Sequence, residues 1–371
     1  MNIHKIDPQN RRDVRKFVRF PFELYKSTPQ WVPPFVAEME ASVQGKHPFF
    51  QHSEADFFLA EDGDKTVGRI AVMNNKRANE FRGTQTAFFG FLEMVDDVDV
   101  TLGLFEAAFE WARQRGLDQI IGPRGMIGSD SGGILVEGFE HRAALAVPYN
   151  HPYFDAHIKA AGFSKDTDHL SGYLPGGHFV PERIKRIAEK IKNRRGYWIK
   201  SFTSKDEMRA WVPSVQAVHR EAFEGTHTFY PPTNAEMKSI AETLIAVADP
   251  SLIKLVMKGD DVIGFIFAYH DISAGLQKAK GRLWPFGWYP ILKERRRNEW
   301  VNINGVGMLP QYQGMGGNAI LYTEIEKSIH AFGFKHMDIV QVNETNFESF
   351  HDMEAIGVQW YKRHRSYKRD L

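Results

Sequence analysis

The stretch WVNINGVGMLPQYQGMGGNAILYTEIEKSIH, residues 300–330, decides the fold. Residues 301–309 predict a strand, and residues 310–317 predict a turn that is rich in glycine. A helix is expected from Asn318 onward, because apolar residues then recur at helical spacing, at Ile320, Leu321, Ile325 and Ile329. Glycines let backbone N–H groups turn toward a ligand, and a helix start adds unpaired N–H groups and a positive dipole end. The stretch therefore predicts an anion site suited to a phosphate or pyrophosphate.

The composition of the whole chain is that of a soluble globular protein. Its 371 residues, 43% hydrophobic and 25% charged, suggest two domains at roughly 100–200 residues each. A net charge of +1 gives no basic field for nucleic acid, so no nucleic-acid partner is expected. The absence of cysteine excludes disulfides and cysteine-bound zinc, and no histidine spacing suggests a metal site. No transmembrane run or signal-peptide core is evident, which predicts a cytoplasmic protein.

The predicted elements follow the same order in both halves of the chain. The first half should contain a hairpin at 57–73, a strand at 86–94, a helix at 102–115, a strand at 119–121, a glycine loop at 122–133, a helix at 153–161 and a strand at 169–174. The second half should contain a strand at 198–202, helices at 205–223 and 233–248, a hairpin at 252–269, the strand, turn and helix of 300–330, a strand at 337–342, a helix at 346–356 and a final aromatic strand. We interpret this order as an internal duplication, with domains at 1–178 and 198–371.

The two predicted domains are joined by a linker helix within residues 179–197. Its sequence, PERIKRIAEKIKNRR at 181–195, is basic and amphipathic. A solvated linker helix is the first interpretation, and contact with nucleic acid or a membrane is the alternative.

Residues 306–318, VGMLPQYQGMGGN, resemble the donor loop of the GNAT N-acyltransferase superfamily. In that superfamily a strand ending in proline is followed by Arg/Gln-x-x-Gly-x-Gly/Ala at a helix start. Gln313 and Gly316 fill the first two positions, and Asn318 stands where the family has Gly or Ala. A second register, Gln311-x-x-Gly314-x-Gly316, matches the motif in full but shifts it relative to the proline.

A second match lies downstream of the loop. Asn346-x-x-Ser349, followed by Gly357 and Val358, resembles a segment in which many GNAT proteins carry a tyrosine general acid. Met353 stands at the tyrosine position here. Tyr322 and Tyr361 are candidates to replace that tyrosine.

The resemblance implies an α/β (α+β) fold of two GNAT-like domains, each with a mixed, mostly antiparallel central sheet flanked by helices. The arrangement resembles the tandem bacterial type, in which the N-terminal half is degenerate. In this half, the sequence MVDDVDVT at 94–101 occupies the place of the donor loop, without glycine and with Asp96, Asp97 and Asp99 following Glu93. These carboxylates would repel a pyrophosphate, so we expect coenzyme A to bind to the second half alone.

The donor implied by the resemblance is acetyl-CoA or another acyl-CoA, bound without a metal. A splayed strand at 304–309 would offer backbone groups to pantetheine, and the amides of 313–318 would hold the pyrophosphate. The expected donor-binding residues are Val306, Gly307, Met308, Gln313, Gly314, Met315, Gly316, Gly317, Asn318 and Asn346.

The implied reaction is direct attack of an amine on the thioester, with a backbone N–H near Met308 stabilising the oxyanion. The acceptor would be a small-molecule or lipid amine. Asn304, His270 and Tyr230 are the catalytic candidates, against the simpler interpretations of a structural histidine and an aromatic loop. A non-catalytic protein that binds acyl-CoA or another ligand is one alternative, and a membrane-surface acyltransferase that acts on a lipid amine is the other.

Residues 278–297, KAKGRLWPFGWYPILKERRR, place seven large apolar side chains between two basic clusters. One interpretation is a loop that packs its aromatic residues on the neighbouring domain. The other is peripheral membrane contact at the inner membrane face, with Trp and Tyr at head-group depth and Lys and Arg meeting anionic lipid. The oligomeric state is left open.

Overall fold

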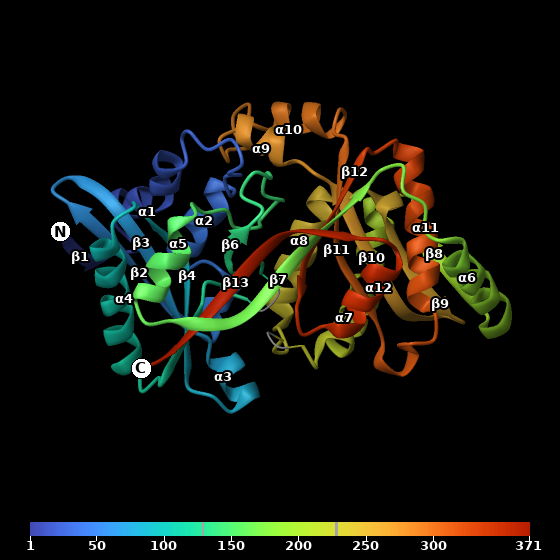
Figure 1. Ribbon diagram of the computed structural model, residues 1–371, viewed down its shortest axis with the longest axis horizontal. Coiled ribbons are helices and arrows are strands. Elements are labelled where there is room, and N and C mark those ends of the chain that lie inside the picture. Colours follow the sequence, from blue (N-terminus) through green and yellow to red (C-terminus); the bar gives the residue numbers. More distant parts are fainter. Residues whose placement is uncertain (128–129, 227–228) are drawn as a thin grey trace. The chain divides into compact units, whose positions relative to one another are not determined.

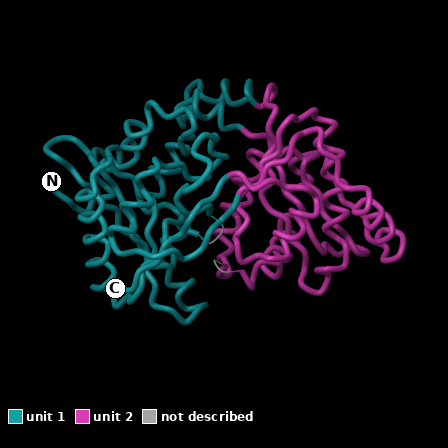
Figure 2. The backbone as a smooth tube through the Cα atoms, in the orientation of Figure 1, with its two compact units in different colours: residues 1–170, 272–294, 362–371 teal, residues 171–271, 295–361 magenta. Residues whose placement is uncertain are grey.

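The computed structural model describes residues 1–127, 130–226 and 229–371, and divides into two compact units. Unit 1 comprises Met1–Leu170, Ile272–Glu294 and Lys362–Leu371, and unit 2 comprises Ser171–Asp271 and Arg295–Tyr361 (Figure 2). The expected division was 1–178 and 198–371. The difference is that residues 272–294 and 362–371, from the second half of the sequence, belong to unit 1.

Unit 1 contains a mixed sheet flanked by helices (Figure 1). Its strand order is β1-β2-β3-β4-β5-β13, and β6 also pairs with β13. The strands are β1 (Asn2–Lys5), β2 (Glu54–Asp62), β3 (Lys65–Asn74), β4 (Thr86–Met94), β5 (Gln119–Gly122), β6 (Ile134–Glu137), β7 (Ser164–Pro175) and β13 (Gln359–Asp370), the last two being divided between the units. The helices are α1 (Arg11–Leu24), α2 (Val36–Val43), α3 (Lys76–Arg82), α4 (Val98–Arg113), α5 (Tyr153–Ala160), α9 (Ser273–Lys278) and α10 (Trp288–Arg295, whose last residue is assigned to unit 2), with a 3-10 turn η1 (Pro48–Gln51).

Unit 2 repeats this plan. Its strand order is β12-β11-β10-β9-β8, built from β8 (Tyr197–Ser201), β9 (Ile253–Lys258), β10 (Asp261–His270), β11 (Trp300–Met308) and β12 (His336–Asn343). Its helices are α6 (Glu182–Arg195), α7 (Lys205–Phe223), α8 (Asn234–Val247), α11 (Gly317–Phe332) and α12 (Phe347–Ala355), with 3-10 turns η2 (Pro250–Leu252) and η3 (Pro310–Tyr312).

The two units share the same strand pairing. In unit 1, β3 and β4 are antiparallel and β4 and β5 are parallel; in unit 2, β10 and β11 are antiparallel and β11 and β12 are parallel. The predicted fold class, mixed and mostly antiparallel sheets flanked by helices, is therefore confirmed. Each unit also has its own apolar core, with Phe89, Leu104 and Phe105 in unit 1 and Ile266, Ile320 and Leu321 in unit 2 all fully buried.

One prediction for the first half was wrong. Residues 94–101 were expected to form a loop, but α4 begins at Val98, because the side chain of Asp97 caps it and accepts a hydrogen bond from the N–H of Asp99 at 2.9 Å. Part of the predicted glycine loop at 122–133, Gly128 and Ser129, lies outside the described residues.

The described residues include no helix with the length and apolar character to cross a bilayer, and no group of three or more His, Asp or Glu side chains placed to hold a metal ion.

Candidate functional site

Strand β11 separates from β12 partway along its length. Their parallel pairing runs from Trp300 opposite His336 to Ile303 opposite Ile339, and stops there. Beyond that point β11 continues to pair with β10, after a register shift at which Gly305 takes a φ of +124°. Among the described residues, the edge of β11 that faces β12 therefore has no strand partner over 304–308, within the stretch 304–309 for which the GNAT resemblance implied a splayed strand.

The glycine turn follows the splayed part of β11. Gly314 and Gly316 have φ values of +66° and +85°, a backbone region that glycine adopts without steric cost. Gly316 is the N-cap of α11, and no side chain in the part of the chain that the structure describes caps this helix start. Its first N–H groups are consequently available to an anion, with the positive end of the helix dipole behind them.

A groove of about 430 Å³ lies over this turn within unit 2. Its lining includes seven of the predicted donor-binding residues, Met308, Gln313, Gly314, Met315, Gly316, Gly317 and Asn318. Three others lie elsewhere: Val306 and Gly307 are on β11 outside the groove, and Asn346 caps α12 by accepting a hydrogen bond from the N–H of Ser349 at 3.1 Å. The volume is within the range of small-molecule sites.

The second wall of the groove is α6, the predicted linker helix. Arg183, Ile184, Ile187, Ile191 and Arg195 from this helix line the groove. Because α6 packs along α11, with Ala188 fully buried, the expectation of a solvated helix was wrong for this face. Amphipathic periodicity revealed that α6 has an apolar face but could not identify what covers it.

The helix also brings positive charge to the turn. Nη1 of Arg195 lies 2.8 Å from the Sδ atom of Met315 inside the turn. Two ion pairs hold α6 in place, Lys185 with Glu326 at 2.9 Å and Lys192 with Glu324 at 2.6 Å.

Asn318, where the family has Gly or Ala, is tied to α12. Its Nδ2 donates to Oδ2 of Asp352 at 2.6 Å, and the Tyr322 hydroxyl reaches the same oxygen at 3.4 Å. Burial, together with the charge of Asp352, raises the pKa of Tyr322, so its phenol stays protonated. Met353, at the family's tyrosine position, points into the core and is 4% exposed.

The other face of β10 and β11 is covered by α7. On this face the Phe265 ring lies against Gly307, since a Cβ on Gly307 would be 2.7 Å from it. Tyr269 is paired with Asn302. Burial and the charges of Asp271 and Asp338 raise the pKa of Tyr269, whereas hydrogen bonds with the Asn302 and Asn304 side chains act in the opposite direction. Asn304, a predicted catalytic residue, therefore lies beside the Tyr269 phenol on the α7 face.

Sequence reasoning missed His219, which projects from α7 on this face. Its ring is 4.8 Å from the ring of Phe223 and 6.3 Å from that of Phe265, measured between centroids. Nδ1 of His219 is buried and has no hydrogen-bond partner among the described residues. Burial lowers the pKa of His219, so the imidazole is neutral at pH 7. The sequence did contain a signal for this residue. His219 lies one helical turn before Phe223, so both side chains are expected on the same face of the helix predicted at 205–223.

The other two predicted catalytic residues are not brought together with Asn304. His270 is paired with Val301 and contacts the rings of Phe332 and Phe334, so it lies on the α11 face of the sheet. Tyr230 is 2% exposed and donates to Glu236 at 3.1 Å, next to the capping box that starts α8. The loop that precedes Tyr230 includes His227 and Thr228, which lie outside the described residues.

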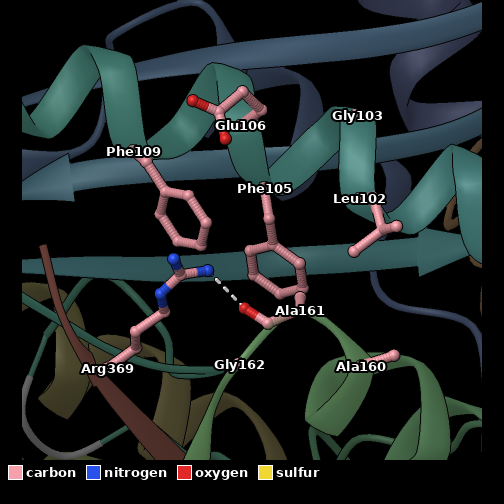
Figure 3. A pocket seen from close by; sticks show the side chains of 9 residues that line it. All are labelled: Leu102, Gly103, Phe105, Glu106, Phe109, Ala160, Ala161, Gly162 and Arg369. Carbon is pink, nitrogen blue, oxygen red and sulfur yellow. Dashed lines mark hydrogen bonds between the residues drawn. The ribbon is translucent and has the colours of Figure 1, made fainter.

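Unit 1 differs from unit 2 at the position that corresponds to the glycine turn. The start of α4 is capped by Asp97, and Asp96 is 3.2 Å from Nε2 of His157, which places carboxylates where unit 2 has open N–H groups. The hollow of about 570 Å³ in unit 1 lies elsewhere, between α4 and the end of α5 (Figure 3). There the Arg369 guanidinium stacks over Phe109 at 4.2 Å and donates to the carbonyl of Ala161.

Comparisons with known proteins agree with this architecture. No family model matches the chain. Two relatives are 25% identical to this chain along almost their whole length. The match to Protein YghO of Escherichia coli (strain K12) covers 98% of this chain and 94% of that protein. The match to the bacterial ceramide synthase of Caulobacter vibrioides (strain NA1000 / CB15N) covers 97% of this chain and 95% of that protein. Among solved structures, a tandem GNAT protein from the clavulanic acid biosynthesis pathway has a TM-score of 0.58 at 12% identity, over 100% of this chain and 98% of that one. A GCN5-related N-acetyltransferase from Sphaerobacter thermophilus has a TM-score of 0.53 at 13% identity, and the match covers 100% of this chain and 95% of that one. The chain therefore has the fold of the GNAT N-acetyltransferases.

Proposed function

We propose that this protein is an N-acyltransferase that moves an acyl group from acyl-CoA to the amine of a long-chain lipid acceptor. The observation that carries the proposal is the open N-terminus of α11, preceded by the stretch of β11 that has left β12. The first feature suits a pyrophosphate, and the second leaves backbone groups free for the amides of pantetheine.

The donor would lie in the groove of unit 2. Backbone N–H groups of 313–318 would hold the pyrophosphate, and Arg183 and Arg195 of α6 would add charge-assisted contacts to the phosphates. The apolar side chains of Ile187 and Ile191 would shield these contacts from water, which strengthens them.

The acceptor amine would approach from the α7 face. His219 would take a proton from the ammonium form, since its neutral imidazole is suited to act as a base. The amine lone pair would then form the C–N bond at the thioester carbonyl, and the oxyanion would meet a backbone N–H near Met308. As the C–S bond breaks, the thiolate of coenzyme A leaves with the electron pair and takes up the proton that the attacking nitrogen loses when it becomes an amide nitrogen.

The class of acceptor rests on a relative. A ceramide is an N-acylated long-chain amino alcohol, and the C. vibrioides protein named as a ceramide synthase is similar to this chain from end to end. We therefore assign a long-chain amino alcohol, or a lipid amine of similar shape, as the acceptor, and a long-chain acyl-CoA as the donor.

A second function is favoured by one observation. Met353 fills the position of the family's tyrosine acid and is buried in the core, so the side chain cannot take that role. A protein that binds acyl-CoA without transferring it would tolerate this change.

The release of free thiol from acetyl-, octanoyl- and palmitoyl-CoA, with and without a long-chain amino alcohol, tests both functions. Acyl transfer predicts release that depends on the acceptor, together with an equal amount of amide detected by mass spectrometry. Donor binding without release would support the non-catalytic alternative. Failure of the protein to bind any of the three donors would exclude both.

A further inference from the structure

The segment Ile272–Glu294 of unit 1 exposes an unusual density of large apolar side chains. Trp284 and Phe286 are 80% and 77% exposed. Leu283, Trp288, Tyr289 and Leu292 are also exposed, so six such side chains occur within ten positions. Helix α10, which contains three of them, buries none of its residues. Contiguous exposed apolar surface on a soluble protein marks an interaction site.

The segment is held firmly in unit 1. Leu276 is fully buried in a small apolar cluster with Val32 and Ala143, and Ile291 packs against that cluster. Nε2 of Gln277 donates to the carbonyl oxygens of Pro29 and Trp31 at 2.8 and 2.7 Å. The fold therefore fixes the base of the segment in unit 1, while the side chains of Trp284, Phe286 and Tyr289 are exposed.

The charge of the segment is positive. Residues 272–293 contain four cations, Lys278, Lys280, Arg282 and Lys293, and no Asp or Glu. Lys278 is paired with Glu294, and the other three are exposed. Arg282 also lies near α1: after burial, its charge is the largest cause that lowers the pKa of Arg19, with Glu40 opposing it and Arg15 adding to it.

We propose that residues 280–293 form a docking surface for a lipid bilayer with anionic head groups. Trp and Tyr prefer the depth of the head groups, Leu and Phe reach the acyl chains, and exposed Lys and Arg meet lipid phosphates. The cores of protein–protein interfaces are depleted of charge, so exposed apolar residues that alternate with exposed cations, with no Asp or Glu within 280–293, favour a membrane over a protein partner. The inference is independent of the acyl-transfer proposal, because vesicle binding requires neither donor nor chemistry.

Co-sedimentation of the full chain with vesicles tests this surface. The vesicles are phosphatidylcholine alone or phosphatidylcholine with 30% phosphatidylglycerol, used at 50 and 500 mM NaCl. The variants are Trp284→Ser/Phe286→Ser, Lys280→Glu/Arg282→Glu and, as a matched control, Phe347→Ser, which removes a side chain that is 78% exposed on α12. Circular dichroism confirms that each variant is folded.

Wild type and Phe347→Ser should bind the anionic vesicles, with weaker binding at high salt. The Trp284→Ser/Phe286→Ser variant should bind at least about tenfold more weakly, because it removes inserted apolar area. Charge reversal should weaken binding by about fivefold or more for each residue. The proposal is overturned if wild type ignores anionic vesicles, or if the aromatic variant binds as well as Phe347→Ser. A wild-type dimer that the aromatic variant dissociates, without vesicle binding, would show that a second copy of the chain is the partner instead.

Discussion

A Cβ atom on Gly316 would lie 2.9 Å from Cγ1 of Ile191. The turn at the start of α11 and the helix α6 are thus in contact, and the contact leaves no room for a side chain at Gly316. A helix that the sequence suggested to be a linker therefore forms one wall of the groove over the glycine turn, and two of its arginines, Arg183 and Arg195, line that groove.

The first prediction concerns Gly314, whose positive φ is combined with open space around its Cβ position. A Gly314→Glu substitution should cost about 1–2 kcal/mol of stability from backbone strain. It should also weaken acyl-CoA binding by at least about tenfold, because the carboxylate repels the pyrophosphate. Isothermal titration measures the affinity. Gly259→Glu is the control, since Gly259 has the same backbone geometry and open space in the β9–β10 hairpin. Equal donor affinities in the two variants would contradict the assignment of the turn.

The second prediction separates two neighbouring cations on α6. Arg195 lines the groove, whereas Arg194 is exposed outside it. Arg195→Ala should weaken coenzyme A binding by about tenfold, in line with the loss of one charge-assisted contact to a phosphate. Arg194→Ala should leave the affinity within about twofold, as expected of an exposed charge. The difference between the two should shrink at 500 mM NaCl. If both variants bind alike, α6 is not a wall of the donor site.

The third prediction concerns the base. Burial lowers the pKa of His219, so kcat/KM should fall as the pH drops through a value below 6.5, where the imidazole becomes protonated. His219→Gln should remove this acidic limb and lower kcat by on the order of 10²–10⁴. His270→Gln, on the opposite face of the sheet, provides the comparison. Loss of the acidic limb in His270→Gln but not in His219→Gln would reverse the assignment.

How much of this could be predicted from the sequence depends on the range of the interaction. Local patterns located the helix over Lys205–Phe223 and the strand over Thr86–Met94 to the residue, because spacing and flanking polar residues determine them. The Gly314–Gly317 turn was predicted for the same reason, since backbone geometry requires glycine there. The GNAT resemblance then supplied the order of the strands.

What could not be predicted depends on partners that are distant in the sequence. Nothing in residues 181–195 indicates that Ile187 and Ile191 meet Gly316, more than a hundred positions away. The sequence equally does not reveal that His270 and Asn304 occupy opposite faces, because this follows from the pairing of His270 with Val301, which lies three residues before Asn304 on β11. Near 94–101, an N-cap aspartate was mistaken for part of a loop, since the same residue types favour both.

The fourth prediction is about stability in acid and concerns unit 1. Burial lowers the pKa of His364 to about 3, while its ordinary value is 6.5, and its Nε2 donates to the carbonyl of Pro148 at 3.0 Å. Between these two pKa values, the unfolded chain therefore binds one more proton than the folded chain. The contribution of His364 to the free energy of unfolding is therefore fully present above pH 6.5. It falls by about 1.4 kcal/mol per pH unit as the pH drops from 6.5 toward 3.

Thermal unfolding at pH 7, 6 and 5 measures this loss, and His364→Gln should show a shallower decline than wild type. The series stops at pH 5 because Asp168 also titrates in acid. Burial raises the pKa of Asp168, but hydrogen bonds with Arg365, Lys165 and Arg363 outweigh this effect and lower the pKa to about 2. Its contribution is present above pH 3.8 and is lost only as the pH falls toward 2. Parallel declines in wild type and His364→Gln would refute the prediction.

The most direct measurement of the central claim is release of free thiol from palmitoyl-CoA by the wild-type chain in the presence of a long-chain amino alcohol. The chain has no cysteine, so every thiol detected comes from coenzyme A. We predict release that requires the acceptor, equals the amount of amide formed, and is lost in Gly314→Glu but not in Gly259→Glu. Binding of palmitoyl-CoA without thiol release, whichever amine is supplied, would contradict the assignment of this protein as an acyltransferase.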